Sequence, residues 1–234
     1  MRPFLLLTLL GAVTAFAAVQ GEGLLPRVTE LTVTGNDRAS TVALRHLADV
    51  RDGASLLTVD LDAVVAGVTR HPWVASATVR RVLPDQLHIT VTEHETAMLV
   101  LLRGLYRVAD DGTVFARARS HELDLPVLTG LDPAVADDSP VAARGVIRQA
   151  QRTLSLLEDA RALDLDQVSE VAFDLDLGFS LVLNNGSRIL LGYRDPALQA
   201  GRLADLRAAG LDLSRPHEVD LDLDGLALAM PLAI

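Results

Sequence analysis

Two runs of alternating apolar and polar side chains meet at a Pro-Asp pair in residues 72–95, and they limit the fold more than any other feature. The sequence there is PWVASATVRRVLPDQLHITVTEHE. Successive side chains of a β-strand point to opposite faces, so each run predicts a strand with one buried face. Because Pro84-Asp85 is typical turn chemistry, the segment predicts a β-hairpin.

The residues before this hairpin predict one strand and two helices. Residues 27–36 alternate in the same way and end at a Gly-Asn turn. Residues 40–50 and 61–71 instead carry apolar side chains at helical spacing, and Asp60 is placed to cap the second helix. The order expected from Val28 to Glu95 is therefore strand, helix, helix, strand, strand.

The second half of the chain predicts a mixture of strands and helices. Its elements are, in order, two short strands around an Asp-Asp-Gly turn in 104–117, a loop at 123–133, a helix in 139–163, three strands in 168–193, a helix in 195–211 and a closing strand from Val219. Ser139-Pro140 and Asp195 mark the two helix starts. Asn185-Gly186 marks a hairpin turn between the last two of the three strands.

The closing segment, VDLDLDGLALAMPL, admits two interpretations. Its D-x-D-x-D-G opening resembles a calcium-binding loop, but the twelfth position of such a loop needs a bidentate carboxylate and here is Pro231. The alternative is a strand with two unlike faces. We therefore expect Val219, Leu221 and Leu223 to face the core, while the intervening aspartates face solvent or a basic partner.

The N-terminus contains one long apolar run, Phe4–Val19, that lacks charged residues. As a helix it would span roughly 24 Å, a little less than the hydrocarbon core of a bilayer. It is either a retained signal-anchor or a signal peptide that is cleaved after Ala17. Both interpretations place the amino end in the cytoplasm and the bulk of the chain outside.

Composition and motifs argue against an enzyme and against nucleic-acid binding. The formal net charge is −10, whereas a phosphate backbone requires a basic stripe. The chain has no cysteine, no G-x-S-x-G segment and no Gly-rich phosphate loop, and His88 and His94 are too far apart along one strand to share a metal. We expect no catalytic residue, no metal site and no cofactor.

The first half of this series resembles a POTRA domain, a small module of envelope proteins. The resemblance rests on VTGN after the first strand, LLTVDLDAV before the second helix, and the Pro-Trp-Val, Arg-Arg, Pro-Asp and closing Val-x-Glu positions of the hairpin. With VADDGTVF, LPVLTG, LVLNNGSRILLG and VDLDLD following in order, the whole chain resembles the FtsQ/DivIB family of bacterial cell-division proteins.

The resemblance implies an α+β fold in three parts. Residues 1–23 would form the membrane helix and its spacer, and 24–95 a β-α-α-β-β POTRA domain. Residues 96–234 would form a mixed α/β domain with a largely antiparallel sheet flanked by helices. The alternatives are another POTRA-containing envelope assembly or secretion factor, and a cleaved secreted binding protein.

The resemblance also implies a function. It is that of a non-enzymatic divisome scaffold in the bacterial inner membrane, single-pass and periplasmic in its bulk, acting at the septum. Such a protein recruits the FtsB/FtsL coiled-coil pair, contacts other divisome components and so regulates septal peptidoglycan synthesis. The implied partner-binding residues are Leu221, Leu223, Gly225, Leu226, Leu228 and Met230.

Two further features qualify this implied site. Many members of the family carry a basic residue followed by an aromatic one in the closing strand, whereas this chain has Asp222 and Leu223. The partner should then present a compensating basic or larger apolar surface. Arg80 and Arg81 are the densest basic spot and a candidate contact of the POTRA domain. On a strand they would point to opposite faces, one partly buried and one exposed, and an ion pair with Glu93 or Glu95 is the simpler role.

Overall fold

The computed structural model describes residues 26–119 and 124–232. The chain divides into two compact units between His94 and Glu95, and each unit is described by itself. The apolar run Phe4–Val19 lies outside the described residues. Within the described ranges, no helix is both long and apolar enough to cross a bilayer.

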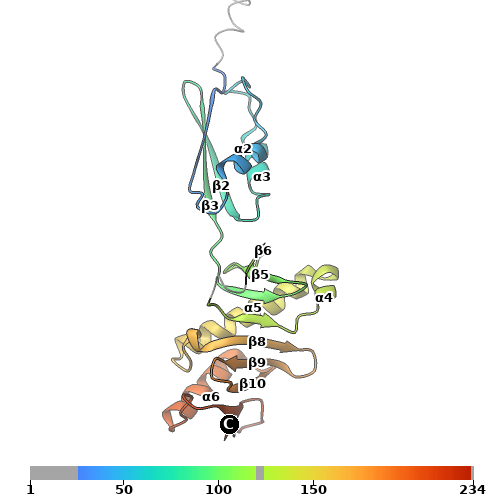
Figure 1. The fold of residues 1–234 in the computed structure, drawn as a ribbon, viewed down its shortest axis with the longest axis vertical. Coiled ribbons are helices and arrows are strands. Elements are labelled where there is room, and N and C mark those ends of the chain that lie inside the picture. Colours follow the sequence, from blue (N-terminus) through green and yellow to red (C-terminus); the bar gives the residue numbers. More distant parts are fainter. Residues whose placement is uncertain (1–25, 120–123, 233–234) are drawn as a thin grey trace, which may run out of the picture. The chain divides into compact units, whose positions relative to one another are not determined.

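The first unit has the predicted order of elements. It contains β1 (Glu30–Thr34), α2 (Thr41–Ala48), α3 (Leu61–Val68), β2 (Val74–Val82) and β3 (Gln86–Glu93). The hairpin β2–β3 is antiparallel, and β1 adds to β3 in parallel, so the strand order is β1-β3-β2. Both helices lie on one face of this sheet (Figure 1), which is the fold expected of a POTRA domain.

The two helices of the first unit are fixed by local chemistry and by close packing. Asp60 caps α3 as predicted, since its carboxylate accepts hydrogen bonds from the backbone N–H groups of Asp62 and Ala63. Gly67 lets α3 approach α2, because a Cβ at this position would lie 2.2 Å from the carbonyl oxygen of Leu47. Leu44, on α2, is fully buried in the resulting core.

The second unit is built on a sheet of nine strands in the order β12-β11-β10-β9-β8-β7-β4-β5-β6. The strands are β4 (Met98–Leu101), β5 (Leu105–Val108), β6 (Val114–Arg117), β7 (Val127–Thr129), β8 (Val168–Asp174), β9 (Gly178–Leu183), β10 (Arg188–Gly192), β11 (His217–Asp220) and β12 (Leu228–Pro231). Antiparallel pairs predominate, but the pairs β4–β7, β7–β8 and β10–β11 are parallel, so the sheet is mixed.

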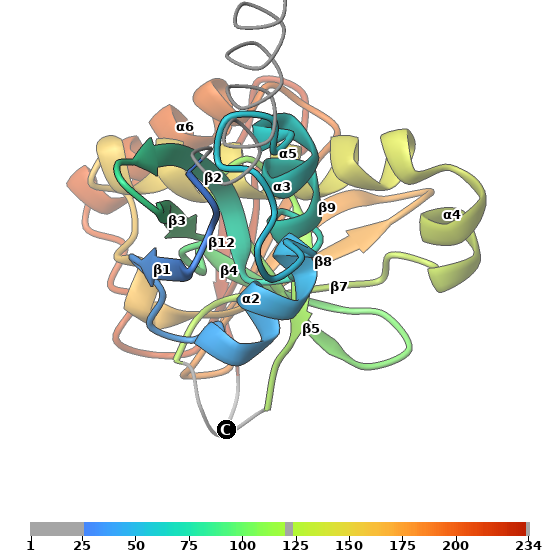
Figure 2. The ribbon, with the colours of Figure 1, turned by 90° about the horizontal axis from the view of Figure 1, so that it is seen from above.

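Three helices accompany this sheet, namely α4 (Pro133–Asp138), α5 (Pro140–Asp159) and α6 (Pro196–Ala208), together with a 3-10 turn at Leu165–Gln167. The long helices α5 and α6 pack on the same face of the sheet (Figures 1 and 2). The core between them and the sheet is aliphatic. Its members include Val100, Leu128, Ile147, Leu157, Val171, Leu181, Ile189, Leu203, Val219 and Leu221.

The sequence patterns miss β4, β7 and α4 in the second unit. The segment 123–133 is expected to be a loop, but it contains β7 and leads into α4. Strand β4 is likewise not predicted. Both strands lie in the interior of the sheet, with parallel pairing on at least one side, and such strands appear as short apolar runs without alternation.

Candidate functional site

The described chain closes with two strands joined by a turn, and not with one strand, and the second of them, β12, forms the edge of the sheet. Strand β11 stops at Asp220, residues 221–227 form a turn (the β11–β12 turn), and β12 then returns antiparallel to β11. The prediction of a continuous strand through Asp224 is therefore wrong. The Asp220 carboxylate accepts the backbone N–H of Asp222, a local bond that competes with strand pairing, and Gly225 adopts φ +69°.

The structure places the six predicted partner-binding residues in three environments. Leu221 is fully buried in the core of the second unit, so its side chain supports the edge from behind and is not available to a partner. Gly225 and Leu226 lie in the turn, where Leu226 is 68% exposed, and Leu223 is partly exposed. Leu228 and Met230 lie on β12 and are 47% exposed each.

Strand β12 presents different side chains to its two sides. Ala229 pairs with the buried Val219 and packs against the core. Leu228 and Met230 alternate with it and therefore project from the other face of the sheet. The exposed side of β12 is thus apolar along its length.

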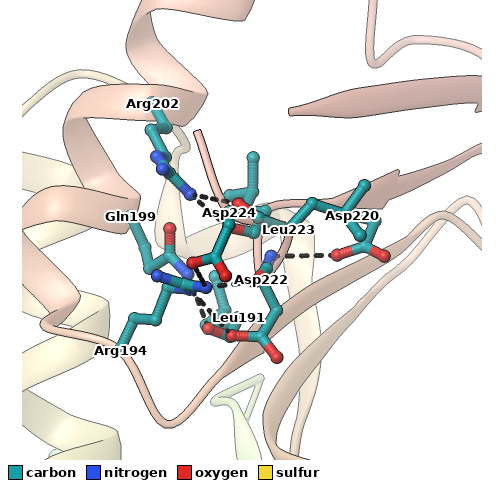
Figure 3. Close-up of polar contacts among 9 residues, drawn as sticks. Leu191, Arg194, Gln199, Arg202, Asp220, Asp222, Leu223 and Asp224 are labelled. Atoms are coloured by element: carbon teal, nitrogen blue, oxygen red, sulfur yellow. Dashed lines mark hydrogen bonds and ion pairs between the residues drawn. The ribbon is translucent and has the colours of Figure 1, made fainter. Parts of the chain in front are cut away.

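Two arginines from the region of α6 hold the β11–β12 turn (Figure 3). Arg194 donates from Nε to the carbonyl oxygen and to Oδ1 of Asp222, and from Nη2 to Oδ1 of Asp224. Arg202 donates from Nη1 to the carbonyl oxygens of Leu221, at 2.7 Å, and Leu223, at 3.1 Å. Together, the guanidinium groups of Arg194 and Arg202 bond to the four consecutive residues 221–224.

Asp222 and Asp224 face solvent as expected, but they also have a basic partner within the chain. Their side chains are 50% and 95% exposed, and both pair with Arg194. The hydrogen bond from Arg194 and the positive charge behind it hold the pKa of Asp224 below its usual value. The same hydrogen bond raises the pKa of Arg194. Both groups are therefore charged at neutral pH.

The end of β10 lies directly against this turn. Gly192 has φ +65°, and a Cβ at this position would lie 2.1 Å from Oδ1 of Asp222. A Cβ on Gly178, at the start of β9, would lie 2.4 Å from the carbonyl carbon of Gly192. The β8–β9 turn, the end of β10 and the β11–β12 turn are consequently neighbours at one end of the sheet.

Three exposed side chains at this end of the sheet are not found by sequence reasoning. Leu175 and Leu177 in the β8–β9 turn are 73% and 72% exposed, and Tyr193 after β10 is also exposed. The Tyr193 hydroxyl lies 2.7 Å from the carbonyl oxygen of Leu175 and donates to the turn. Asp174 accepts two backbone N–H groups of the same turn, which lowers its pKa.

The three exposed side chains and the leucines of the β11–β12 turn form an apolar surface at this end of the sheet. We call it the sheet-end surface: Leu175, Leu177, Tyr193, Leu223 and Leu226. Leu223 and Leu226 of this surface are among the expected partner-binding residues, whereas the sequence signal for Leu175 and Leu177 is their place in the acidic segment 174–178, between two predicted strands.

The arginine pair of the first unit is only partly as expected. Arg80 and Arg81 are both exposed, so the expectation that one is partly buried is wrong. Arg81 donates to the carbonyl oxygens of Leu56 and Val59 and so anchors the loop before α3. Neither arginine pairs with Glu93 among the described residues, because the strand register places Glu93 opposite Val74, at the other end of the hairpin. The Glu93 carboxylate instead accepts the backbone N–H groups of residues 37–39.

The site offers polar contacts and exposed apolar side chains, which suit binding. Within residues 26–119 and 124–232, no group of three or more His, Asp or Glu side chains is arranged to hold a metal ion. The aspartates of the β11–β12 turn, which the calcium interpretation would use, are engaged by Arg194.

Comparison with known proteins gives matches to both units. A family model described as POTRA domain, FtsQ-type, matches residues 27–94, and one described as cell division protein FtsQ/DivIB, C-terminal, matches residues 100–231. A protein of Anaeromyxobacter sp. (strain K) named cell division protein FtsQ is 37% identical over 216 residues, covering 92% of this chain and 73% of the relative. Proteins of the same name from Myxococcus fulvus and Syntrophotalea carbinolica are 33% and 32% identical, over 76% and 83% of this chain and 62% and 71% of those relatives.

Proposed function

Because the chain belongs to the FtsQ/DivIB family of cell division proteins, we propose that it is a non-enzymatic divisome scaffold that recruits the FtsB/FtsL pair at strand β12. Recruitment of this pair would regulate septal peptidoglycan synthesis. The observation that carries the proposal is β12 itself, a strand at the edge of the sheet with exposed Leu228 and Met230.

An edge strand binds a partner by accepting one more strand. Backbone hydrogen bonds then supply affinity, and alternate side chains select the partner. The outer side of β12 pairs with no other strand of the described residues. The strand is only four residues long and ends in Pro231, which lacks an N–H group. A short edge ending in proline limits pairing between copies of the chain while leaving room for a specific partner.

The chemistry of the surface defines the segment that it would accept. Leu228 and Met230 require apolar side chains at alternate positions of the added strand. The sheet-end surface continues from the turn and would take the residues flanking that strand, with Tyr193 as an exposed aromatic anchor. Asp224 is paired on one side, but its side chain is 95% exposed. A basic residue in the partner would therefore be favourable next to this turn.

The membrane anchor is a separate part of the proposal. We propose that Phe4–Val19 is retained as a single inner-membrane span, with the bulk of the chain periplasmic and located at the septum. The apolar run without charges supports this topology. The intact mass of the protein extracted from membranes tests it, since loss of the first 17 residues would show that the segment is a cleaved signal peptide.

A titration tests recruitment directly. The periplasmic segment of FtsB from the same organism is added to residues 24–234 in a calorimeter, and Leu228→Glu is compared with the wild type. We expect the added carboxylate on β12 to weaken binding by at least tenfold, because burying a charge against an apolar partner costs free energy. Val141→Glu is the matched control, because Val141 is 87% exposed on α5, away from this edge.

The outcomes separate the interpretations. Binding by the wild type and by Val141→Glu, but not by folded Leu228→Glu, supports β12 as the recruiting edge. Absence of heat with the wild type contradicts FtsB recruitment. Equal weakening by both substitutions would indicate a nonspecific effect of the added charge.

A further inference from the structure

We propose that Arg194 and Arg202 are positioning residues for the partner-binding edge, which hold the β11–β12 turn so that β12 is already in register when a partner arrives. This inference rests on the proposed function for its effect on binding. Its effect on β12 in the free protein is independent of any partner.

Strand β12 has little to hold it in place by itself. Its burial pattern is exposed, intermediate, exposed, exposed, and Ala229 alone of its four residues packs against the core, with Ala227 just before it. Its pairing with β11 covers four residue pairs, from His217–Pro231 to Asp220–Leu228. A terminal strand with so little buried area is at the low-stability end of a domain and opens locally unless something else anchors it.

The two arginines provide that anchor from a rigid base. Arg202 lies on α6, whose neighbouring Leu203 is fully buried, and Arg194 precedes Asp195, which caps the same helix. The Arg194 side chain reaches Asp222 and Asp224, 28 and 30 positions later in the sequence, and the Arg202 side chain reaches Leu221 and Leu223, 19 and 21 positions later. The helix that covers the sheet is thereby tied to the segment that leads into β12.

The arrangement also explains why one guanidinium serves two carboxylates. Gly192 allows the Asp222 carboxylate to lie against the backbone of β10, and Asp224 follows two residues later in the same turn. Without Arg194, two like charges would remain in one turn, directly after a third carboxylate at Asp220. Their repulsion would favour open conformations of the turn.

Holding β12 in place lowers the cost of binding. A strand that is already ordered does not lose conformational freedom when a partner pairs with it, so more of the interaction energy appears as affinity. Loss of either arginine should therefore have two effects. It should expose the β12 backbone to exchange in the free protein, and it should weaken binding of the partner.

Hydrogen exchange of the full-length protein in detergent tests the first effect. We expect Arg194→Ala and Arg202→Ala to raise the exchange rate of the amides in residues 226–232 roughly tenfold, while residues 168–183 in β8 and β9 are unchanged. Arg152→Ala is the matched control, because Arg152 is an exposed arginine on α5. Unchanged exchange in residues 226–232 of both variants would overturn the inference.

Binding of the FtsB segment to the same variants tests the second effect and separates positioning from direct contact. If Arg194 only positions the turn, the Asp222→Asn/Asp224→Asn variant also weakens binding, but less than Arg194→Ala does, because the asparagine oxygens still accept hydrogen bonds from Arg194 and no like charges remain. The triple variant is then no weaker than Arg194→Ala alone. If Arg194 instead contacts the partner, freeing it from its aspartates leaves binding unchanged or stronger, and the inference fails.

Two further outcomes keep this inference distinct from the proposed function. If the wild type does not bind the FtsB segment, recruitment at β12 is refuted, and the exchange comparison alone decides whether the arginines hold the strand. Faster exchange combined with unchanged affinity would overturn the positioning role, because the contacts would then serve folding only.

Discussion

Leu221 and Leu226 lie in the same turn but should respond to truncation in opposite ways. Leu221 is fully buried in the core of the second unit, whereas Leu226 is 68% exposed. Replacing a fully buried leucine by alanine costs about 2–5 kcal/mol, and the low end applies where the surroundings can collapse. Since Leu221 is close to the edge of the sheet, we expect Leu221→Ala to lower the free energy of unfolding by about 3 kcal/mol.

This loss should appear in the second unit alone. For a domain of this size it corresponds to a melting temperature lower by about 10 °C. Far-UV circular dichroism of residues 24–234 in urea follows both units. The chain has one tryptophan, Trp73, which lies in the first unit. Its fluorescence is therefore an internal control that should not change.

Leu226→Ala should leave the stability nearly unchanged and weaken partner binding instead. An exposed truncation changes stability by less than about 0.5 kcal/mol, but it removes part of the sheet-end surface and should weaken binding of the FtsB segment. A loss of stability below about 1 kcal/mol for Leu221→Ala would refute the placement of this side chain in the core. A binding defect of folded Leu221→Ala that exceeds that of Leu226→Ala would refute the division between support and contact.

Three other perturbations follow from the structure. Gly130 has φ +79°, and a Cβ there would lie 1.9 Å from the carbonyl oxygen of Phe173. Gly130→Ala should therefore lower the free energy of unfolding, measured by thermal denaturation, by about 2 kcal/mol or more. An unchanged stability would contradict the close contact between the end of β7 and β8. Because the pKa of Asp224 is lowered in the folded protein, the stabilisation from its ionised carboxylate is fully present above the usual pKa of aspartate and is lost as the pH falls through the lowered pKa of the folded state. The melting temperature should therefore drop below about pH 4, and it should drop less steeply in Asp224→Asn. Equal dependence of the melting temperature on pH in the two proteins would disprove this contribution. Arg81→Ala should destabilise the first unit by about 1 kcal/mol by removing two hydrogen bonds to backbone carbonyls, as followed by tryptophan fluorescence. Arg80→Ala should leave it within about 0.5 kcal/mol, and equal losses would show that the bonds of Arg81 contribute nothing.

The elements that the sequence predicts correctly are those whose signals are local. The hairpin around Pro84-Asp85 alternates over enough residues to define both strands, and the cap at Asp60 is a contact over two or three residues. Strand β7, by contrast, has three residues and pairs in parallel on both sides. Three residues are too few to establish an alternation, and the place of this strand depends on neighbours far away in the chain.

The candidate site shows the same limit at the level of single residues. The alternation from Val219 correctly places Val219 and Leu221 in the core, but it fails from Asp222 onward. The local bond between Asp220 and Asp222 competes with strand pairing, but the turn is held by Arg194, 28 residues before Asp222, and no local pattern reveals a bond over that distance. Two of the charges of the closing segment are therefore paired within the chain, although both carboxylates remain exposed.

The basic and then aromatic pair that the family resemblance implies for the closing strand has a structural counterpart after the neighbouring strand. This chain has Asp222 and Leu223 at the implied positions, but Tyr193 and Arg194 directly follow β10. Gly192 brings these two residues against the β11–β12 turn, and Arg194 binds Asp222 there. The basic and aromatic groups are thus present at the same end of the sheet, supplied by a different strand. A partner that meets this surface would find the aromatic group exposed and the basic group engaged with aspartates, so its own complementary charge should be positive and not negative.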